Sequence, residues 1–188
     1  MQPPKIILSK LETAERQLDT AIWLWFHEGE VVSITQLVDA AMGVLDDLLF
    51  HHKRDRPIPF KPELMQGLKP NEVRPAMTSA ADFAKHARKD PEEAYEYNPG
   101  FPEHYIFCTI LARTALLGED DDTYSGLRGA FTLWYGVFHP ENFDHRSSAF
   151  QRARELIDAD SLKKLSRGEF LRKMAPMFVG NPPRPDAP

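Results

Sequence analysis

The run from Ser9 to Phe50 constrains the fold of this chain more than any other part, because its helix boundaries follow from individual residues. Ser9-Lys10-Leu11-Glu12 is a capping box: the serine hydroxyl accepts from a backbone N–H of the first helical turn and the glutamate reaches back to the serine N–H. Gly29 is the expected end of this helix. Between these signals, apolar residues recur with a helical period at Leu11, Ala14, Leu18, Ala21, Ile22 and Trp25.

A second helix is predicted directly after Gly29. Ser33-Ile34-Thr35-Gln36 is a second capping box, with Val32 and Leu37 placed to form a hydrophobic staple. Two helices joined by so short a connection are antiparallel neighbours, so this region predicts an αα-hairpin. The apolar stripe of the second helix consists of Leu37, Val38, Ala41, Leu45, Leu48 and Leu49.

The next stretch, 55–75, is predicted to be a loop because it holds five prolines, which exclude a long helix. Ser79 is then predicted to cap a third helix that ends near Lys89. Phe101-Pro102-Glu103 opens a fourth helix, because proline suits the first turn, and Gly118 is its expected stop.

The remaining helices are predicted from the same kinds of signal. A fifth helix covers roughly Thr123 to Phe138 and ends before Pro140. A sixth begins near Asp144 or Arg146, Asp160 caps a short seventh, and a third capping box, Ser166-Arg167-Gly168-Glu169, opens the last.

Because no segment alternates apolar and polar residues, the sequence predicts an all-α fold. We expect an antiparallel helical bundle of six to seven helices, with the proline-rich loop crossing one end. A chain of 188 residues is long enough for one well-buried core, so 1–179 is predicted to be a single domain. Residues 180–188 hold four prolines and are predicted to be a disordered tail.

Composition narrows the class of protein. The hydrophobic fraction of 42% and the charged fraction of 27% are those of a globular protein. No apolar run is long enough to span a bilayer, and the first residues lack the apolar stretch of a signal peptide. The one cysteine, Cys108, has no partner for an internal disulfide and lies on an apolar helical stripe, so we expect an inert buried thiol. A cytoplasmic location in a bacterial cell follows, with no membrane partner.

Charge is unevenly distributed along the chain. The net charge is −5, but residues 146–188 carry nine Lys and Arg against five Asp and Glu. This bias suggests nucleic-acid binding as one alternative, and the acidic residues between the basic ones favour an ordinary solvated surface. The nucleic-acid alternative requires one merged patch of Arg152, Arg154, Lys163, Lys164, Arg172 and Lys173.

The densest polar cluster is Asp82-Phe83-Ala84-Lys85-His86-Ala87-Arg88-Lys89-Asp90. On a helix, Asp82, His86 and either Lys89 or Asp90 can share one face, and a carboxylate beside a histidine orients the imidazole and raises its basicity. The pattern favours either a general base or a site in which Lys85 and His86 hold an anionic ligand. An exposed helix with an ordinary ion pair has the same pattern.

A second polar cluster follows the fifth predicted helix and contains His139, Glu141, Asp144 and His145. Its nitrogen and oxygen donors suit a metal, but the spacing matches no recognised ligand motif, so we expect no metal and no cofactor. Aromatic residues suggest a different role. Trp25 and Trp134 lie on apolar stripes and are predicted core residues, whereas Trp23 lies off its stripe and is a candidate interface residue.

Two stretches together resemble a family of small bacterial all-helical proteins of uncharacterised activity. They are Leu11 to Ile22 with Ser33 to Ala41, and Phe83 to Pro91 with Ala130-Phe131 and Trp134 downstream. The hairpin also resembles a HEPN domain, a nucleotide-binding helical bundle. Many HEPN domains are ribonucleases with a histidine four to six residues after an arginine. Arg16 to His27 and Arg128 to His139 are longer intervals, so this resemblance implies a nuclease-dead member that binds nucleotide, RNA or protein.

The sequence also lacks a glycine-rich phosphate loop, a nucleophile elbow and paired cysteines. The leading hypothesis is therefore a non-enzymatic binding or protein-interaction module, expected to be a homodimer. The alternative is a ligand-binding protein or enzyme that uses Asp82, Lys85, His86 and Asp90. These hypotheses differ in one testable respect, because the alternative needs His86 in a concave pocket.

Overall fold

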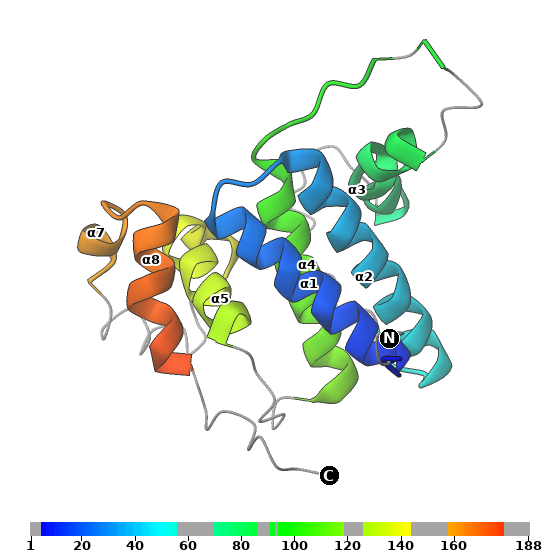
Figure 1. Cartoon of the computed structure of the whole chain (residues 1–188), viewed down its shortest axis with the longest axis horizontal. Helices are drawn as coiled ribbons and strands as arrows, with labels where there is room; N and C mark the ends of the chain where they lie inside the picture. The colour runs from blue at the N-terminus through cyan, green and yellow to red at the C-terminus, as the bar shows by residue number, and fades with distance from the viewer. Residues whose placement is uncertain are drawn as a thin grey trace.

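The computed structural model of the chain describes residues 5–55, 70–85, 91–92, 94–118, 126–143 and 158–178. In these ranges all regular secondary structure is helical, which confirms the predicted all-α bundle (Figure 1). None of the described helices combines the length and the apolar composition that a membrane crossing requires. In chain order the elements are α1 (Lys10–Phe26), α2 (Val31–His51), α3 (Pro70–Lys85), α4 (Phe101–Leu117), α5 (Gly126–Phe138), the 3-10 turn η1 (Pro140–Asn142), α7 (Ala159–Leu162), α8 (Arg167–Met174) and the 3-10 turn η2 (Ala175–Phe178).

The predicted αα-hairpin is present as α1 and α2. The first capping box is confirmed, because the Ser9 N–H donates to Glu12 Oε2 at 2.7 Å and the Glu12 N–H donates to Ser9 Oγ at 3.1 Å. Gly29, the predicted stop, is not the residue in the left-handed conformation. Glu28 adopts it, with φ of 54°, and the Gly29 N–H donates to the Leu24 carbonyl at 2.8 Å. Glycine is instead favoured at position 29 because there is little room for a side chain: a Cβ there would lie 3.0 Å from the Leu24 carbonyl oxygen.

The predicted capping box at the start of α2 is wrong. The helix begins at Val31, and Glu30 is its N-cap, accepting from the Ser33 N–H at 2.9 Å. A carboxylate at this end also interacts favourably with the helix dipole, which a serine hydroxyl does not. Gln36, the expected partner of Ser33, has a different role, because its amide donates to the Ala81 carbonyl at 3.0 Å and so ties α2 to α3.

The third helix begins earlier than predicted. Pro70 is the first residue of α3, a position at which the missing N–H costs no helical hydrogen bond. Residues 70–75, predicted as the end of the loop, therefore belong to the helix. Ser79 is therefore inside the helix and is not its N-cap; its hydroxyl shares a 2.7 Å hydrogen bond with the Tyr95 hydroxyl. Residues 56–69 of the predicted loop and the predicted helix end near Lys89 lie outside the described residues.

The helix ends of the second half agree with the sequence signals in most places. Gly118 ends α4 with φ of 96°, and α5 ends before Pro140. The Ser166–Glu169 capping box is confirmed at α8. The predicted cap of α7 is two residues late, because Asp158, not Asp160, accepts from the Ser161 N–H at 3.1 Å. The predicted sixth helix, at 144–157, and the tail, at 180–188, lie outside the described residues.

The core is built around an aromatic cluster where α1, α5 and α8 meet. The Trp25 ring lies 4.2 Å from Trp134 and 5.0 Å from Phe131, measured between centroids. Both tryptophans are buried, as predicted, and Phe170 of α8 stacks on Phe26 at 6.4 Å. Cys108 is also buried, and burial raises the pKa of its thiol, which agrees with the expected inert residue.

Two carboxylates of α1 hold two buried arginines. Arg113 of α4 is 1% exposed and donates to Glu15, while Arg128 of α5 is 4% exposed and donates from Nε to Asp19 Oδ1 at 2.8 Å and from Nη1 to Glu15 Oε1 at 3.2 Å. Although burial opposes the charged form, the Asp19 carboxylate holds the pKa of Arg128 above its ordinary value. These bonds connect α1 to both helices.

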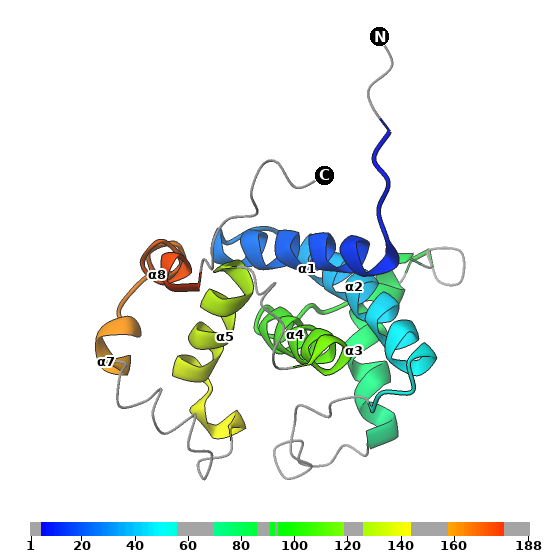
Figure 2. The ribbon, with the colours of Figure 1, turned by 90° about the horizontal axis from the view of Figure 1, so that it is seen from below.

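The arrangement of the helices places two helix ends together. Figure 2 shows α1 across one side of the bundle, with α4 between α5 and the pair formed by α2 and α3. Arg113 lies late in α4 and Arg128 early in α5, and both donate to Glu15 of α1. The start of α4 and the end of α5 are therefore neighbours at the opposite end of the bundle.

Gly129 allows η2 to pack against α5, which makes a sharp test of the core. A Cβ at Gly129 would lie 2.7 Å from Phe178 Cβ, whereas a Cβ at Gly43 of α2 would meet nothing within 4 Å. Gly129→Ala is expected to lower the free energy of unfolding by about 1–3 kcal/mol through overpacking. The matched control Gly43→Ala should raise it by about 0.5–1 kcal/mol, since alanine favours helix. Urea unfolding measures both, and equal stabilisation by the two changes would refute the close packing.

Candidate functional site

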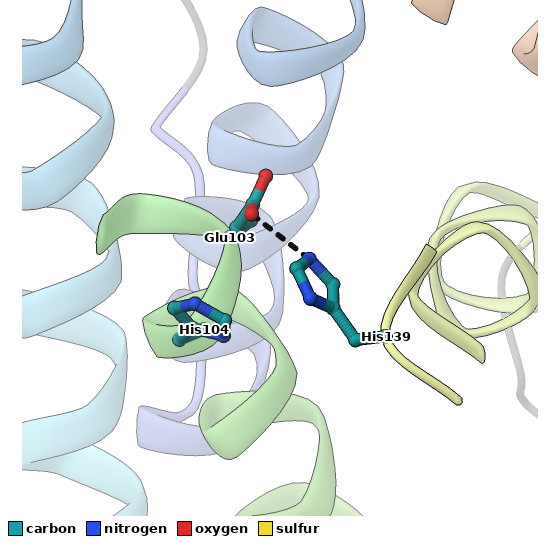
Figure 3. Close-up of side chains that lie close together, drawn as sticks. All are labelled: Glu103, His104 and His139. Carbon is teal, nitrogen blue, oxygen red and sulfur yellow. Dashed lines mark hydrogen bonds and ion pairs between the residues drawn. The ribbon is translucent and has the colours of Figure 1, made fainter. Parts of the chain in front are cut away.

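Three potential metal ligands meet where the start of α4 faces the end of α5. Glu103 and His104 lie in the first turns of α4, and His139 follows α5 directly (Figure 3). One ligand atom from each lies within 4.8 Å of the others, and all three side chains are half-buried. Among the residues that the structure describes, these three form the group of His, Cys, Asp or Glu side chains that lies close enough together to share a metal ion.

Local sequence signals explain the placement of these residues. Gly100 is the N-cap of α4 and Pro102 lies in its first turn, so Glu103 occupies a position where an acidic group interacts favourably with the helix dipole. At the other helix, Pro140 cannot continue α5, and the His139 N–H makes the closing bond to the Tyr135 carbonyl at 2.8 Å. The His139 side chain is thereby left at the helix end, facing α4.

His139 lies between two carboxylates. Its Nε2 is 2.9 Å from Glu103 Oε1, and its Nδ1 is 3.4 Å from Glu141 Oε1. Glu103 is the more buried of the two, with 12% of its side chain exposed against 56% for Glu141. The ring is therefore oriented from both nitrogens, one facing the cluster and one facing η1.

His104 is oriented by a tyrosine. Its Nδ1 is 2.7 Å from the Tyr135 hydroxyl, which also accepts from the Asn142 amide at 2.8 Å. The Tyr135 ring is itself fixed by packing, because it stacks on Phe107 with 4.1 Å between centroids. These contacts hold His104 4.9 Å from His139, measured between ring centroids.

Burial sets the electrostatics of the site. It raises the pKa of the Glu103 carboxyl, an effect that the neighbouring His139 and the Arg167 guanidinium oppose. Burial also lowers the pKa of His104, with the His139 charge acting in the same direction. The pKa of Tyr135 is raised for the same reason. His104 is therefore neutral at physiological pH, which is the form of histidine that binds metals.

Of the four residues of the site predicted around residues 82–90, the structure describes Asp82 and Lys85, so the site itself stays a prediction. Asp82 is exposed on α3, and Lys85 makes an ion pair with Asp39, which also accepts from the Tyr105 hydroxyl at 2.8 Å. Lys85 thus ties α3 to α2. His86 and Asp90 lie outside the described residues.

The second predicted cluster is present in part. His139 and Glu141 lie close together, with 3.4 Å between His139 Nδ1 and Glu141 Oε1, whereas Asp144 and His145 lie outside the described residues. Sequence reasoning missed Glu103 and His104. The available signal was their position, because Glu103-His104 opens one helix beside a proline and His139 closes another beside a proline.

Trp23, the predicted interface residue, is 48% exposed on α1. Its ring stacks on His27 with 4.2 Å between centroids. Of the six basic residues in the predicted nucleic-acid patch, Lys163, Lys164, Arg172 and Lys173 are exposed, and Arg152 and Arg154 lie outside the described residues.

Comparisons with protein families, with curated proteins and with solved structures give no match. The chemistry of the site must therefore be inferred from its own residues. Two imidazoles and one carboxylate form a donor set that suits a transition metal, and this use engages all three residues. Proton transfer would use the His139–Glu103 pair alone.

The lowered pKa of His104 has a consequence for stability. The unfolded chain takes up a proton near the ordinary value of 6.5 and the folded chain resists it, so the stabilisation is complete above about pH 6.5 and is lost as pH falls below it. We expect the free energy of unfolding of the wild type to decrease between about pH 7 and about pH 5. The part of this decrease that comes from His104 should be absent in His104→Gln. Urea unfolding across this range measures it. The raised pKa of Glu103 acts in the opposite sense at lower pH, so the comparison with the variant is required. An identical pH profile for both proteins would contradict the burial of His104.

Proposed function

We propose that this chain is a metal-binding helical-bundle protein that holds a divalent transition metal through Glu103, His104 and His139. The observation that supports it is that three donor atoms, supplied by the ends of two helices, lie within 4.8 Å of one another. This proposal replaces the sequence-based expectation of no metal, which rested on residues 139–145 alone.

The separation of the donors is compatible with metal binding after a small contraction. Zinc bonds of about 2.1 Å in a tetrahedron separate ligand atoms by roughly 3.4 Å. The largest separation in the cluster is no more than 4.8 Å, and small rotations of these three side chains would cover the difference. The 2.9 Å bond between His139 Nε2 and Glu103 Oε1 already joins two of the donors at less than that spacing.

The neighbours of the donors have the positions expected of outer partners. Ligating histidines usually donate their second ring N–H to a carboxylate or another oxygen, which fixes the ring and its tautomer. Glu141 lies on the side of His139 that faces away from Glu103. Tyr135 and Asn142 form a second such group at His104. Imidazole with one carboxylate favours zinc, iron, cobalt or nickel over calcium and magnesium.

Titration of the full chain with Zn²⁺ or Co²⁺ tests the proposal. Isothermal calorimetry is expected to show one ion per chain, and an excess of about 100 times the Kd should add about 2.7 kcal/mol to the free energy of unfolding. His139→Gln and Glu103→Gln are expected to weaken binding by about 100-fold or more, and Glu141→Gln by about 10-fold as an outer partner. His51→Gln is the matched control, because His51 is exposed at the end of α2. Stoichiometric binding that these site variants leave unchanged would refute the site.

Trp23 supports a second function. Large aromatic residues at the surface favour interfaces, and Trp23 stacks on His27 so that two exposed rings lie together at the C-terminal end of α1. We propose that this surface joins two copies of the chain, so that the protein is also an interaction module. The nuclease-dead HEPN alternative, and a cytoplasmic location in bacteria, stay predictions alongside it.

Light scattering after size exclusion tests the dimer. The full chain is expected to elute as a dimer, and Trp23→Glu is expected to shift it to a monomer because a buried carboxylate would be unpaired. Phe50→Glu is the matched control, since Phe50 is 84% exposed and lies on α2. A monomeric wild type at concentrations of about 100 μM, or dissociation by the Phe50 change instead, would contradict the assignment to Trp23.

A further inference from the structure

The outer face of α1 carries a row of exposed side chains that no described helix covers. α1 packs on the bundle through its opposite face, where its buried residues lie. Figure 2 shows α1 along one edge of the bundle, with α4 and α5 on one side of it and no described helix on the other. The outer row consists of side chains spaced three or four residues apart, which places them on one face of the helix: Glu12, Arg16, Thr20, Trp23 and His27.

The order of these side chains makes the outer row complementary to itself. Arg16 and Trp23 lie at equal distances along α1 from the point between Asp19 and Thr20. If two copies of α1 pack antiparallel about a twofold axis at that point, Arg16 of each copy meets the partner's Trp23. A guanidinium over a tryptophan ring is a favourable cation–π arrangement. In the part of the chain that the structure describes, Arg16 makes no ion pair that would hold its guanidinium elsewhere.

A second pair in the outer row follows the same symmetry. Glu12 and His27 are also equidistant from that point, so the same axis brings the Glu12 carboxylate to the partner's His27. The His27 Nδ1 lies 2.8 Å from the Trp23 carbonyl, which leaves its Nε2 to face the partner. Thr20, beside the axis, is small and needs no polar partner there, because its hydroxyl donates to the Arg16 carbonyl at 2.7 Å.

An exposed apolar arm, residues 6–8, precedes α1 on the same side. Ile6 is 73% exposed and Ile7 94%. In Figure 2 the arm rises from the start of α1 away from α4, which is the side of the outer row. Antiparallel packing places the start of one α1 beside the end of the other, so each arm lies against the partner's Trp23 and His27. A stable interface buries about 800 Å² per partner, and the arm adds apolar area that one helix face lacks.

We propose that two copies of the chain associate through α1 in antiparallel orientation, with Arg16 of each copy over the partner's Trp23 and with each apolar arm packed on the end of the partner's α1. This inference rests on the proposed dimer through Trp23 and adds its symmetry, its register and a second segment. A second copy is the occupant that fits, because each group of the outer row finds its complement within the same row.

Oxidative cross-linking of one introduced cysteine tests the register. In a twofold dimer, a residue beside the axis lies next to its own copy. Thr20→Cys is therefore expected to form a disulfide-linked dimer at least about 10-fold faster than Asp47→Cys, because the dimer raises the effective concentration of the two thiols. Asp47 is the matched control, since it is exposed on α2, and the native Cys108 is 1% exposed and does not compete.

Light scattering on the same samples separates this inference from the proposed dimer. Equal cross-linking of Thr20→Cys and Asp47→Cys in chains that scatter as dimers would overturn the antiparallel register and leave the dimer through Trp23 intact. A monomeric wild type would overturn both proposals.

Reversal of one charge tests the contact between Arg16 and the partner's Trp23. Arg16→Glu is expected to raise the Kd of the dimer by about 10-fold or more, because the contact occurs twice in each dimer and a carboxylate is repelled by the ring face. Arg172→Glu is the matched control, because Arg172 is exposed on α8 and the change in charge is the same. Analytical ultracentrifugation measures both values. Equal affinity in Arg16→Glu and the wild type would overturn the register.

A polar substitution in the apolar arm tests the second segment. Ile7→Asp is expected to raise the Kd of the dimer by about 10-fold or more, since an isoleucine buried in the interface is lost from each copy. The helix content should stay that of the wild type, because Ile7 is exposed in the single chain. Met177→Asp is the matched control, since Met177 is 72% exposed and lies in η2. Equal dimer affinity in Ile7→Asp and Met177→Asp would overturn the role of the arm.

Discussion

The packing of this bundle depends on two carboxylates of α1, Glu15 and Asp19, which hold the guanidinium groups of Arg113 and Arg128. A buried cation is stable only when a counter-ion meets it, and leaving one unpaired costs about 3–5 kcal/mol. Because both arginines are almost completely buried, α4 and α5 can pack on α1 only where these carboxylates lie. The ion pairs thereby fix the height of both helices along α1. Glu103, His104 and His139 meet at the far end as a result of that alignment.

The helix boundaries show which features of the fold sequence can predict. The Ser9–Glu12 and Ser166–Glu169 boxes are correct because every atom in them comes from within four residues. The Ser33 box is wrong because it has a local competitor: the Glu30 carboxylate accepts from the Ser33 N–H, and the helix begins earlier. Ser79 is wrong because its hydroxyl has a partner, Tyr95, that is distant in sequence. Local competition and distant partners are the two ways in which a cap signal fails.

The candidate site was harder to predict from the sequence than the helix boundaries were. His139 and Glu141 attracted notice because they are close in sequence, whereas Glu103 is 36 residues from His139 and meets it only through the alignment of α4 with α5. The Lys85 segment attracted notice for its density of charge, and the charge of Lys85 is used to attach α3 to Asp39. Clustering in sequence indicates a polar surface. A binding site in a helical bundle depends on which helix ends face each other.

The burial of Cys108 gives the protein an internal reporter of its own motions. The chain has one cysteine, and its side chain is 1% exposed in the middle of α4, on the helix whose first turn carries Glu103 and His104. A thiol reagent can reach this sulfur only when α4 separates from its neighbours. The rate of labelling therefore measures how often the bundle opens, with no other cysteine to confuse the signal. Any ligand that joins α4 to α5 slows that labelling, so occupancy of the site is readable from a single sulfur atom.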